Sequence, residues 1–136
     1  VQVMAEHDEQ VALFAWAALQ AGAYPELDLL FAVPNGAKLP WRRDKQGRRY
    51  SPEGKRLKAE GMRAGVPDLM LPVARRGYHG LFVEMKYGDN EPSEEQAKWL
   101  DALSEQGYLA TVCWGYEDAQ QTILEYLSGG NDEQDF

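Results

Sequence analysis

Two short apolar stretches in the middle of the chain each carry ionised groups. They are residues 65–71 and residues 81–87. Successive side chains of a strand point to opposite faces, so Phe82, Glu84 and Lys86 are predicted to share one face of the second stretch. The other face carries Leu81, Val83 and Met85. The pattern predicts two β-strands that hold ionised groups where a core would be expected.

Residues 72–80, which join these two strands, fit a hairpin connection. The segment contains Gly77 and Gly80, and a connection with glycine suits the return of an antiparallel strand. Such a hairpin brings Asp68, in the first strand, close to Glu84 in the second. The sequence therefore predicts that two carboxylates and a lysine meet on one rigid sheet.

The rest of the chain gives an α/β order of elements. The predicted helices are residues 9–21, which end at Gly22, residues 52–62 with Ser51 as N-cap, the segment from Ser93 to Gly107, and residues 117–127. The further predicted strands are residues 27–33, followed by a turn at Pro34-Asn35-Gly36, and residues 109–114. Residues 37–51 are predicted to form a mobile loop. The third helix begins with a capping box in which Gln96 reaches back to Ser93.

Length and composition agree with one small folded domain. A chain of 136 residues with 44% hydrophobic residues can bury a core without staples. We expect a single domain over residues 1–128, with a basic insertion at about 37–63 and a disordered acidic tail over 129–136. No apolar run approaches the length of a membrane helix and the chain opens on a polar stretch, so the expected compartment is the cytoplasm.

The two acids and the lysine of the hairpin have the composition of a metal site. Carboxylate oxygens are the ligands that Mg²⁺ prefers, and two of them suffice when phosphate oxygens and waters complete the set. The backbone carbonyl of Met85 offers a further oxygen. Lys86 would then stabilise a hydroxide nucleophile and the charge of a phosphoryl transition state. The alternative is an exposed Glu84–Lys86 ion pair worth ~0–1 kcal/mol, but the preceding Pro67-Asp68 and the apolar setting favour a site.

Other chemistry has less support in the sequence. His7 and His79 have no partners at zinc spacing, and Cys113 lies in an apolar run where it is expected to be a small buried hydrophobe. Glu9 shares one helix face with Leu13 and Trp16, so this acid borders the buried stripe. The structural alternative to a functional role of Glu9 is a favourable interaction with the helix macrodipole, worth ~0.3–1 kcal/mol.

Positive charge is concentrated in one segment, although the net charge of the chain is −8. Residues 38–63 hold ten bases and three acids, a net +7, whereas the remaining chain has four bases and nineteen acids, a net −15. The ten bases are Lys38, Arg42, Arg43, Lys45, Arg48, Arg49, Lys55, Arg56, Lys58 and Arg63. A basic segment on an acidic body is typical of a phosphate-binding surface, although a solvated loop has the same composition. Trp41 and Tyr50 add stacking surfaces that suit distorted or single-stranded DNA.

An ordered set of motifs resembles a known nuclease family. Pro67-Asp68 followed by Glu84-Met85-Lys86 resembles the signature of the restriction-endonuclease-like superfamily. The surrounding motifs are Glu9-Gln10, Pro34-Asn35-Gly36, Gly61-Met62-Arg63-Ala64-Gly65-Val66-Pro67-Asp68, Ser93-Glu94-Glu95-Gln96 and Gly107-Tyr108. In this order they resemble the VRR-NUC (virus-type replication-repair nuclease) domain in its stand-alone phage or bacterial form. The resemblance covers about residues 6 to 128.

The resemblance implies a fold and a set of roles. The fold is a restriction-endonuclease-like core, a small mixed sheet flanked by helices. The implied activity is a Mg²⁺- or Mn²⁺-dependent DNA endonuclease of replication and repair, acting on branched DNA such as four-way (Holliday) junctions or flaps, in a bacterial or phage-infected cytoplasm. Asp68, Glu84 and the Met85 carbonyl would bind the metal, Lys86 would position the nucleophile, and Gln96 would lie near the site. Glu9 would complete it, with Glu6 as the competing helix acid.

Two further functions and one assembly accompany this expectation. The rivals are a restriction-type or nicking enzyme on linear duplex and a non-catalytic DNA-binding module on the same scaffold. Symmetric cleavage of a junction requires two active sites related by a two-fold axis, so we expect a homodimer. The aromatic residues available for an interface are Trp41, Tyr78, Tyr108, Trp114 and Tyr116.

Overall fold

A mixed four-stranded sheet forms the centre of the computed structural model, which describes residues 6–34 and 40–130. Its strands are ordered β1 (Phe31–Ala32), β4 (Leu69–Leu71), β5 (Leu81–Lys86) and β6 (Leu109–Trp114). The first three are antiparallel neighbours, and β6 pairs parallel to β5. The predicted α/β class and the hairpin between the two charged strands are confirmed.

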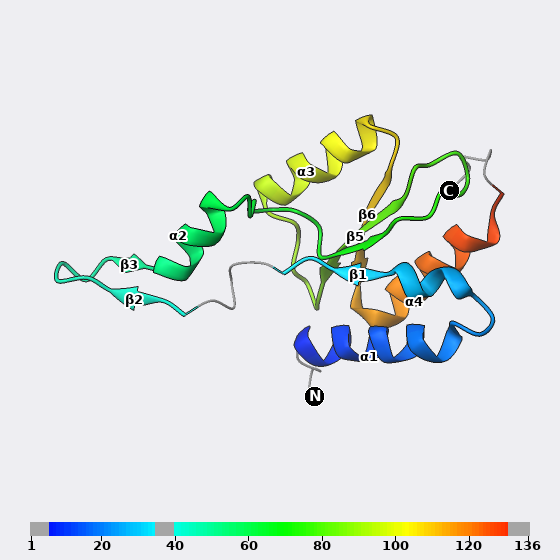
Figure 1. The fold of residues 1–136 in the computed structure, drawn as a ribbon, viewed down its shortest axis with the longest axis horizontal. Helices are drawn as coiled ribbons and strands as arrows, with labels where there is room; N and C mark the ends of the chain where they lie inside the picture. The colour runs from blue at the N-terminus through cyan, green and yellow to red at the C-terminus, as the bar shows by residue number, and fades with distance from the viewer. Residues whose placement is uncertain (1–5, 35–39, 131–136) are drawn as a thin grey trace.

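Helices lie on both sides of this sheet. The helices α1 (Glu6–Gln20) and α4 (Gly115–Ser128) lie against each other on one side, and α3 (Glu94–Glu105) lies on the other (Figure 1). A short 3₁₀ helix, η1 (Pro25–Leu29), connects α1 to β1. Within the described residues, no helix combines the length and the apolar character needed to cross a membrane.

The core lies between the sheet and the pair α1 and α4. The side chains of Leu81, Val83 and Met85 are buried, as the alternation predicts for one face of β5. They pack with Leu13 of α1 and Ile123 of α4, both fully buried. By contrast, α3 has no buried residue, so the opposite face of the sheet is more thinly covered. That thinly covered face carries Glu84 and Lys86.

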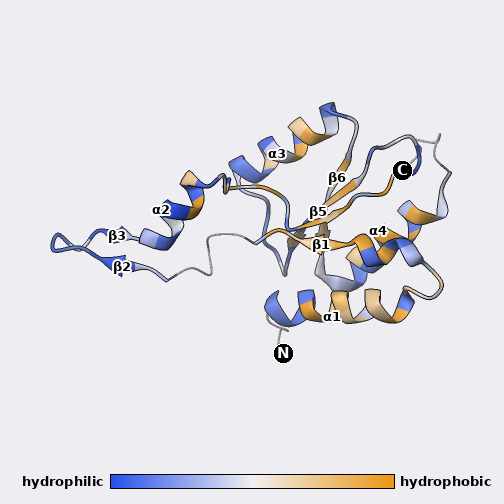
Figure 2. Ribbon diagram, in the orientation of Figure 1, coloured by the Kyte–Doolittle hydropathy of each residue, from blue (hydrophilic) through white to orange (hydrophobic). Residues whose placement is uncertain are grey.

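A basic arm projects from the sheet, and we use this name for residues 40–59. It consists of the strands β2 (Arg42–Arg43) and β3 (Arg49–Tyr50) and the helix α2 (Pro52–Ala59) (Figure 1). Its strands and much of α2 are hydrophilic, whereas apolar residues are concentrated in the sheet (Figure 2). Ser51 caps α2 as predicted, accepting a hydrogen bond from the Gly54 amide at 3.1 Å.

The prediction of a loop over residues 37–51 is wrong for its second half, which is a hairpin. Asp44 builds the turn, because its Oδ1 accepts hydrogen bonds from the amides of Gln46 and Arg48 at 2.9 and 2.8 Å. Gly47 follows with a φ of +79°. Aspartate at the first position and glycine at the fourth is a known turn signature, so the sequence did contain the signal.

The prediction of a strand over residues 27–33 is wrong for its first part. Pro25 begins η1 instead, and Leu27 is buried beneath it. Only Phe31 and Ala32 pair with β4. An apolar run of this length fits a strand or a short helical turn equally well, and proline at the first helical position favours the turn.

The other boundaries differ by a few residues. Compared with the predicted ranges, α1 begins earlier, α2 ends sooner, and α4 begins at Gly115. The capping box of Ser93 and Gln96 is present as predicted. The predicted turn residues Asn35 and Gly36 and most of the predicted tail, residues 131–136, lie outside the described residues. The assignment of residues 1–128 to one domain stays a prediction.

Candidate metal centre and nucleic-acid cavity

Asp68 and Glu84 stand opposite each other across the β4–β5 hairpin. Leu69 pairs with Val83, so the next pair outward in the antiparallel register is Asp68 with Glu84. The Asp68 Oδ2 atom accepts a hydrogen bond from the Met85 amide at 2.8 Å. The backbone of β5 therefore fixes one carboxylate beside the other.

Glu84 is a buried acid with one unused oxygen. Its side chain is almost inaccessible, at 2% exposure for the residue, and Oε1 is buried without a hydrogen-bond partner. The other oxygen, Oε2, lies 3.8 Å from Lys86 Nζ. Burial and the nearby Asp68 carboxylate together raise the pKa of Glu84 to about 8, although Lys86 lowers it. Burying a carboxylate oxygen without a hydrogen-bond donor costs free energy, unless a cation binds that oxygen.

These groups open into a cavity of about 660 Å³ between the arm and the sheet. Its wall is formed by residues from α1, the arm, the connection between α2 and β4, the strand β5 with Tyr87, and the start of α3. The lining residues are Glu6, Gln10, Trp41, Ser51, Gly54, Lys55, Lys58, Met62, Arg63, Ala64, Gly65, Val66, Asp68, Glu84, Met85, Lys86, Tyr87 and Gln96. The cavity thus has an acidic floor and a basic wall.

The helix acid that lines the cavity is Glu6, and Gln10, one helical turn later, lines it too. Glu9 lies elsewhere, at the start of α4, where its Oε1 atom accepts a weak hydrogen bond from the Tyr116 amide at 3.4 Å. Glu9 also lies in the first turn of α1, so the helix-terminus explanation considered for it applies to its own helix and to α4.

Gln96 and Tyr87 complete the polar wall. Gln96 lines the cavity while its Oε1 atom accepts a hydrogen bond from the Ser93 amide at 2.9 Å, so the capping box fixes its side chain. The phenol of Tyr87 is buried, and burial together with Glu9, Asp68, Glu6 and Glu84 raises its pKa. Sequence analysis missed Tyr87, whose signal is its place directly after β5, adjoining the metal motif.

The arginines of the arm are largely engaged in holding the arm together. Arg42 forms an ion pair with Glu53 at 3.0 Å, and Arg48 forms one with Asp44 at 3.0 Å. Arg43 donates to the Gly47 carbonyl at 2.8 Å. These three predicted DNA contacts therefore also serve the local structure.

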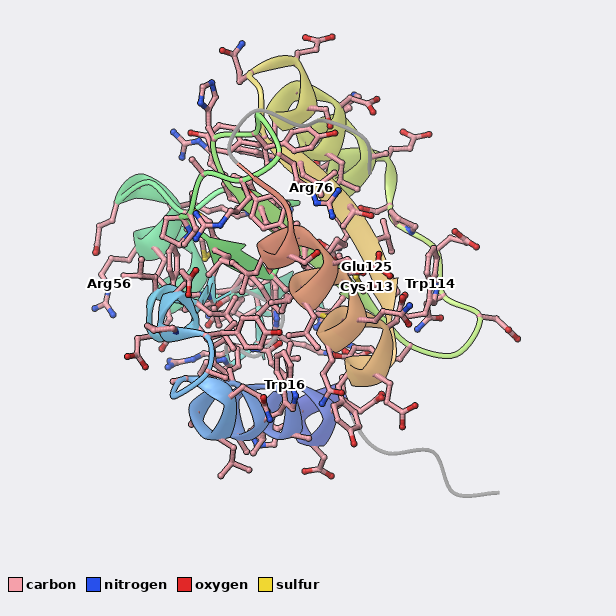
Figure 3. All side chains as sticks on the ribbon, turned by 90° about the vertical axis from the view of Figure 1, so that its right-hand side faces the viewer. Trp16, Arg56, Arg76, Cys113, Trp114 and Glu125 are labelled. Carbon is pink, nitrogen blue, oxygen red and sulfur yellow. The ribbon has the colours of Figure 1, made fainter. Side chains whose placement is uncertain are left out.

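The bases that face the cavity are Lys55, Lys58 and Arg63. Arg56 points away from the molecule (Figure 3) and lies 3.8 Å from Glu60. Lys45 is exposed at the turn of the hairpin, and Lys38 lies outside the described residues. The structure thus divides the nine predicted bases among the described residues into a cavity-facing set and an outer set.

The loop before Asp68 packs closely against the start of α3. Gly65 has a φ of +90°, and a Cβ atom there would lie 2.9 Å from the backbone carbonyl of Glu95 and 3.0 Å from Trp99 Cδ1. Glycine is therefore required twice at this position, for its conformation and for the contact. This contact fixes the distance between Asp68 and the helix that carries Gln96.

The donor set of the site fits a hard divalent cation. Among residues 6–34 and 40–130, no three His, Cys, Asp or Glu side chains form a group able to hold a metal. The acids that meet here are Asp68 and Glu84, and Mg²⁺ commonly uses one or two carboxylates together with waters and substrate phosphates. A cation at this site would bind the unpartnered oxygen of Glu84.

Comparison with known proteins identifies the family. The model of the VRR-NUC domain matches residues 44–117, more than half of the chain. The chain belongs to the VRR-NUC family. A solved structure of a VRR-NUC domain protein is 25% identical, covers 98% of this chain and 96% of its own, and superposes with a TM-score of 0.78. No curated protein sequence matches.

Membership of the VRR-NUC family identifies a nuclease with the restriction-endonuclease-like fold. The matched segment includes the arm from Asp44 onward, both acids of the hairpin, Lys86 and Gln96. The helix-one acid and the predicted DNA-binding residues Lys38, Arg42 and Arg43 lie outside it. The resemblance predicted from the motifs is confirmed.

Proposed function

We propose that this VRR-NUC protein is a metal-dependent, structure-specific endonuclease that hydrolyses phosphodiesters in branched DNA. The observation that carries the proposal is the buried, unpartnered oxygen of Glu84 next to Asp68 and Lys86, at the floor of a cavity with a basic wall. A binding module without catalysis would have no use for a buried carboxylate with one unpartnered oxygen in this place.

Asp68 and Glu84 would hold Mg²⁺ or Mn²⁺, with the Met85 carbonyl as a further oxygen. Among the helix acids, Glu6 is favoured over Glu9 because it lines the cavity. When bound, the metal supplies a Lewis acid that activates water and withdraws charge from the phosphate.

The protein groups then have defined tasks. The attacking water would lose one proton to solvent, and the Lys86 ammonium would donate a hydrogen bond to the resulting hydroxide. The hydroxide oxygen would form a bond to phosphorus as the bond to the leaving sugar oxygen breaks. The leaving oxygen takes a proton from solvent. Lys55, Lys58 and Arg63 bind the phosphates on either side of the cut and keep the backbone in line.

Branched DNA and a homodimer are part of this proposal. Each active site cuts one strand, so paired cuts in a four-way junction require two sites related by a two-fold axis. Of the aromatic residues considered for an interface, Trp114 is exposed, at 42%, whereas Trp41 lines the cavity. A stand-alone phage or bacterial repair enzyme would have this form.

Cleavage of labelled DNA by metal-stripped protein, with Mg²⁺ or Mn²⁺ added back, tests the function. Four-way junction, flap, linear duplex and single strand are compared. We expect cleavage of branched DNA that Asp68→Asn, Glu84→Gln and Lys86→Ala each reduce by at least about 10²-fold, with DNA binding retained. Asp89→Asn and Lys98→Ala, exposed and outside the cavity, are the matched controls.

Each alternative gives a different result. Full activity of either acid variant at saturating Mg²⁺ would overturn the metal assignment. Equal cleavage of linear duplex would leave a general or nicking nuclease. Binding without cleavage by any metal would leave a DNA-binding module. A monomeric mass by light scattering, with unpaired nicks in an immobile junction, would refute the dimer.

A further inference from the structure

Trp41 reaches the metal site from a distant part of the chain. It directly precedes β2 in the arm, yet it lines the same cavity as Asp68 and Glu84. Its side chain is 49% exposed, unusually open for a tryptophan. A large aromatic surface is therefore presented to whatever enters the cavity.

The indole is held in place from one side. The Arg49 guanidinium carbon lies 4.7 Å from the centre of the Trp41 ring, a cation–π contact. The adjacent Arg42 is tied to Glu53 at the start of α2 by a 3.0 Å ion pair. The ring is thus oriented before any ligand arrives, which lowers the entropy lost on binding.

Other residues that line the cavity match the parts of one nucleotide. Lys55 and Lys58 of the same cavity can bind phosphate, and Met62 and Val66 add apolar surface. Asp68 and Glu84 line the same cavity. A base within a duplex is already stacked on both sides, so only an unpaired base can offer its face to an indole.

We propose that Trp41, backed by Arg49, stacks on an unpaired nucleotide next to the scissile phosphate, so that the enzyme selects DNA with an unstacked base at the cut. This inference rests on the proposed function, because it concerns the substrate of the same cavity. Trp41 is a specificity-determining residue in this arrangement, and the chemistry of the metal centre does not need it.

Fluorescence of 2-aminopurine tests the stacking directly. The probe is placed at the single unpaired nucleotide of a flap duplex, or at the matching paired position of a linear duplex, in Ca²⁺ to hold back cleavage. Wild-type protein should quench the unpaired probe. Trp41→Leu should lose this quenching and bind the flap about 5- to 100-fold more weakly, with binding to the linear duplex within about twofold.

Two variants separate stacking from damage to the arm. Trp41→Phe keeps an aromatic face and should restore most of the quenching. Trp114→Leu removes an indole of similar exposure, which is attached to β6 and lies outside the cavity. It lies on the opposite side of the molecule from Arg56 of the arm (Figure 3), and its loss should leave the quenching unchanged.

The outcomes distinguish this inference from the proposed function. Unchanged quenching in Trp41→Leu, or equal weakening for both DNAs, overturns the stacking. A lower mass of Trp41→Leu by light scattering with unchanged quenching would assign Trp41 to a contact between two copies of the chain and also overturns it. If wild-type protein cleaves no DNA but the quenching depends on Trp41, the nuclease proposal fails and the stacking stands.

Discussion

At the scale of single residues, Glu84 shows how a nuclease site opposes stability. The buried carboxylate is almost inaccessible to solvent and lies beside the like charge of Asp68. The Lys86 ammonium, at 3.8 Å, offsets part of this unfavourable environment. Burial and Asp68 shift its pKa upward to about 8, which measures the same unfavourable environment. Under the proposed function, the side chain is kept there because it binds the metal.

Glu84→Gln is therefore expected to stabilise the metal-free protein while it abolishes cleavage. The amide removes the buried negative charge, and we expect the free energy of unfolding in EDTA to rise by about 1–2 kcal/mol. Thermal unfolding with excess EDTA measures this. Glu91→Gln, an exposed loop variant, should leave the melting temperature unchanged. A lower melting temperature of Glu84→Gln would contradict this account of the site.

Tyr126 is a buried residue with a purely structural task. Its hydroxyl donates to the Val73 carbonyl at 2.5 Å and accepts from the Arg75 amide at 3.2 Å. Tyr126→Phe removes the partner of both groups and should lower the free energy of unfolding by about 1–3 kcal/mol, with cleavage unchanged below the melting temperature. Tyr50→Phe, at an exposed position, is the control.

The same residue predicts a pH dependence. Burial raises the pKa of Tyr126 above its ordinary value of 10. The folded state thus holds this proton more tightly than the unfolded state, so the contribution is complete below pH 10 and is lost as pH rises through the folded pKa. Urea unfolding at neutral and alkaline pH should show a smaller alkaline loss of stability in Tyr126→Phe. Equal losses in both proteins would refute the assignment.

The position of a residue could be predicted from the sequence where local structure determines it, and could not where tertiary packing does. Asp68, Glu84 and Lys86 could be found in the sequence because strand alternation and one short hairpin determine their position. The choice between Glu6 and Glu9 could not be made there. They differ by about 60° around the helix, and the packing of α1 against α4 decides which one faces the cavity.

At the scale of elements, the connection through Gly65 sets the site by bringing two elements together. Gly61 and Gly65 both have positive φ angles, +113° and +90°, but only Gly65 lies against α3. We expect Gly61→Ala and Gly65→Ala to share a backbone penalty of about 1–2 kcal/mol. Gly65→Ala should in addition lose at least about tenfold in cleavage, because Asp68 and Gln96 must move apart.

Thermal unfolding and cleavage rates of the two alanine variants, measured in parallel, test this coupling. The Gly61 variant controls for the positive φ angle, since nothing lies within 4 Å of its added Cβ. Equal cleavage by both folded variants would show that the contact with Glu95 does not position the site.

Elements with strong local signals were predictable, and those decided by competition were not. The capped helix α3 and the β4–β5 hairpin have both local signals and tertiary packing in their favour. The region from Pro25 to Val33 had an apolar run that fits more than one element. The two strands of the hairpin β2–β3 are short and exposed, so their sequences contain no apolar alternation that would predict strands.

At the scale of the whole molecule, binding to DNA is expected to depend on a few cavity-facing bases. Lys55 and Lys58 line the cavity, whereas Arg48 is engaged with Asp44. The slope of log affinity against log salt, measured above 0.1 M by anisotropy, should fall by about 1 for each of Lys55→Ala and Lys58→Ala. Arg48→Ala should change it less, and Lys98→Ala not at all. Unchanged slopes in both cavity variants would move the phosphate contacts to another surface.

The projecting arm also gives the molecule a large electric dipole, because its basic residues lie at one end of a protein whose net charge is negative. At physiological ionic strength the Debye length is ~8 Å, so DNA near the arm is attracted by the arm alone. At ~0.01 M salt that length grows to ~30 Å, and DNA also senses the net charge of −8. The association rate, followed by stopped flow, should therefore rise and then fall as salt is added. Because its basic residues lie on an arm apart from the acidic remainder, this nuclease needs some salt to screen its net negative charge before it can approach DNA quickly.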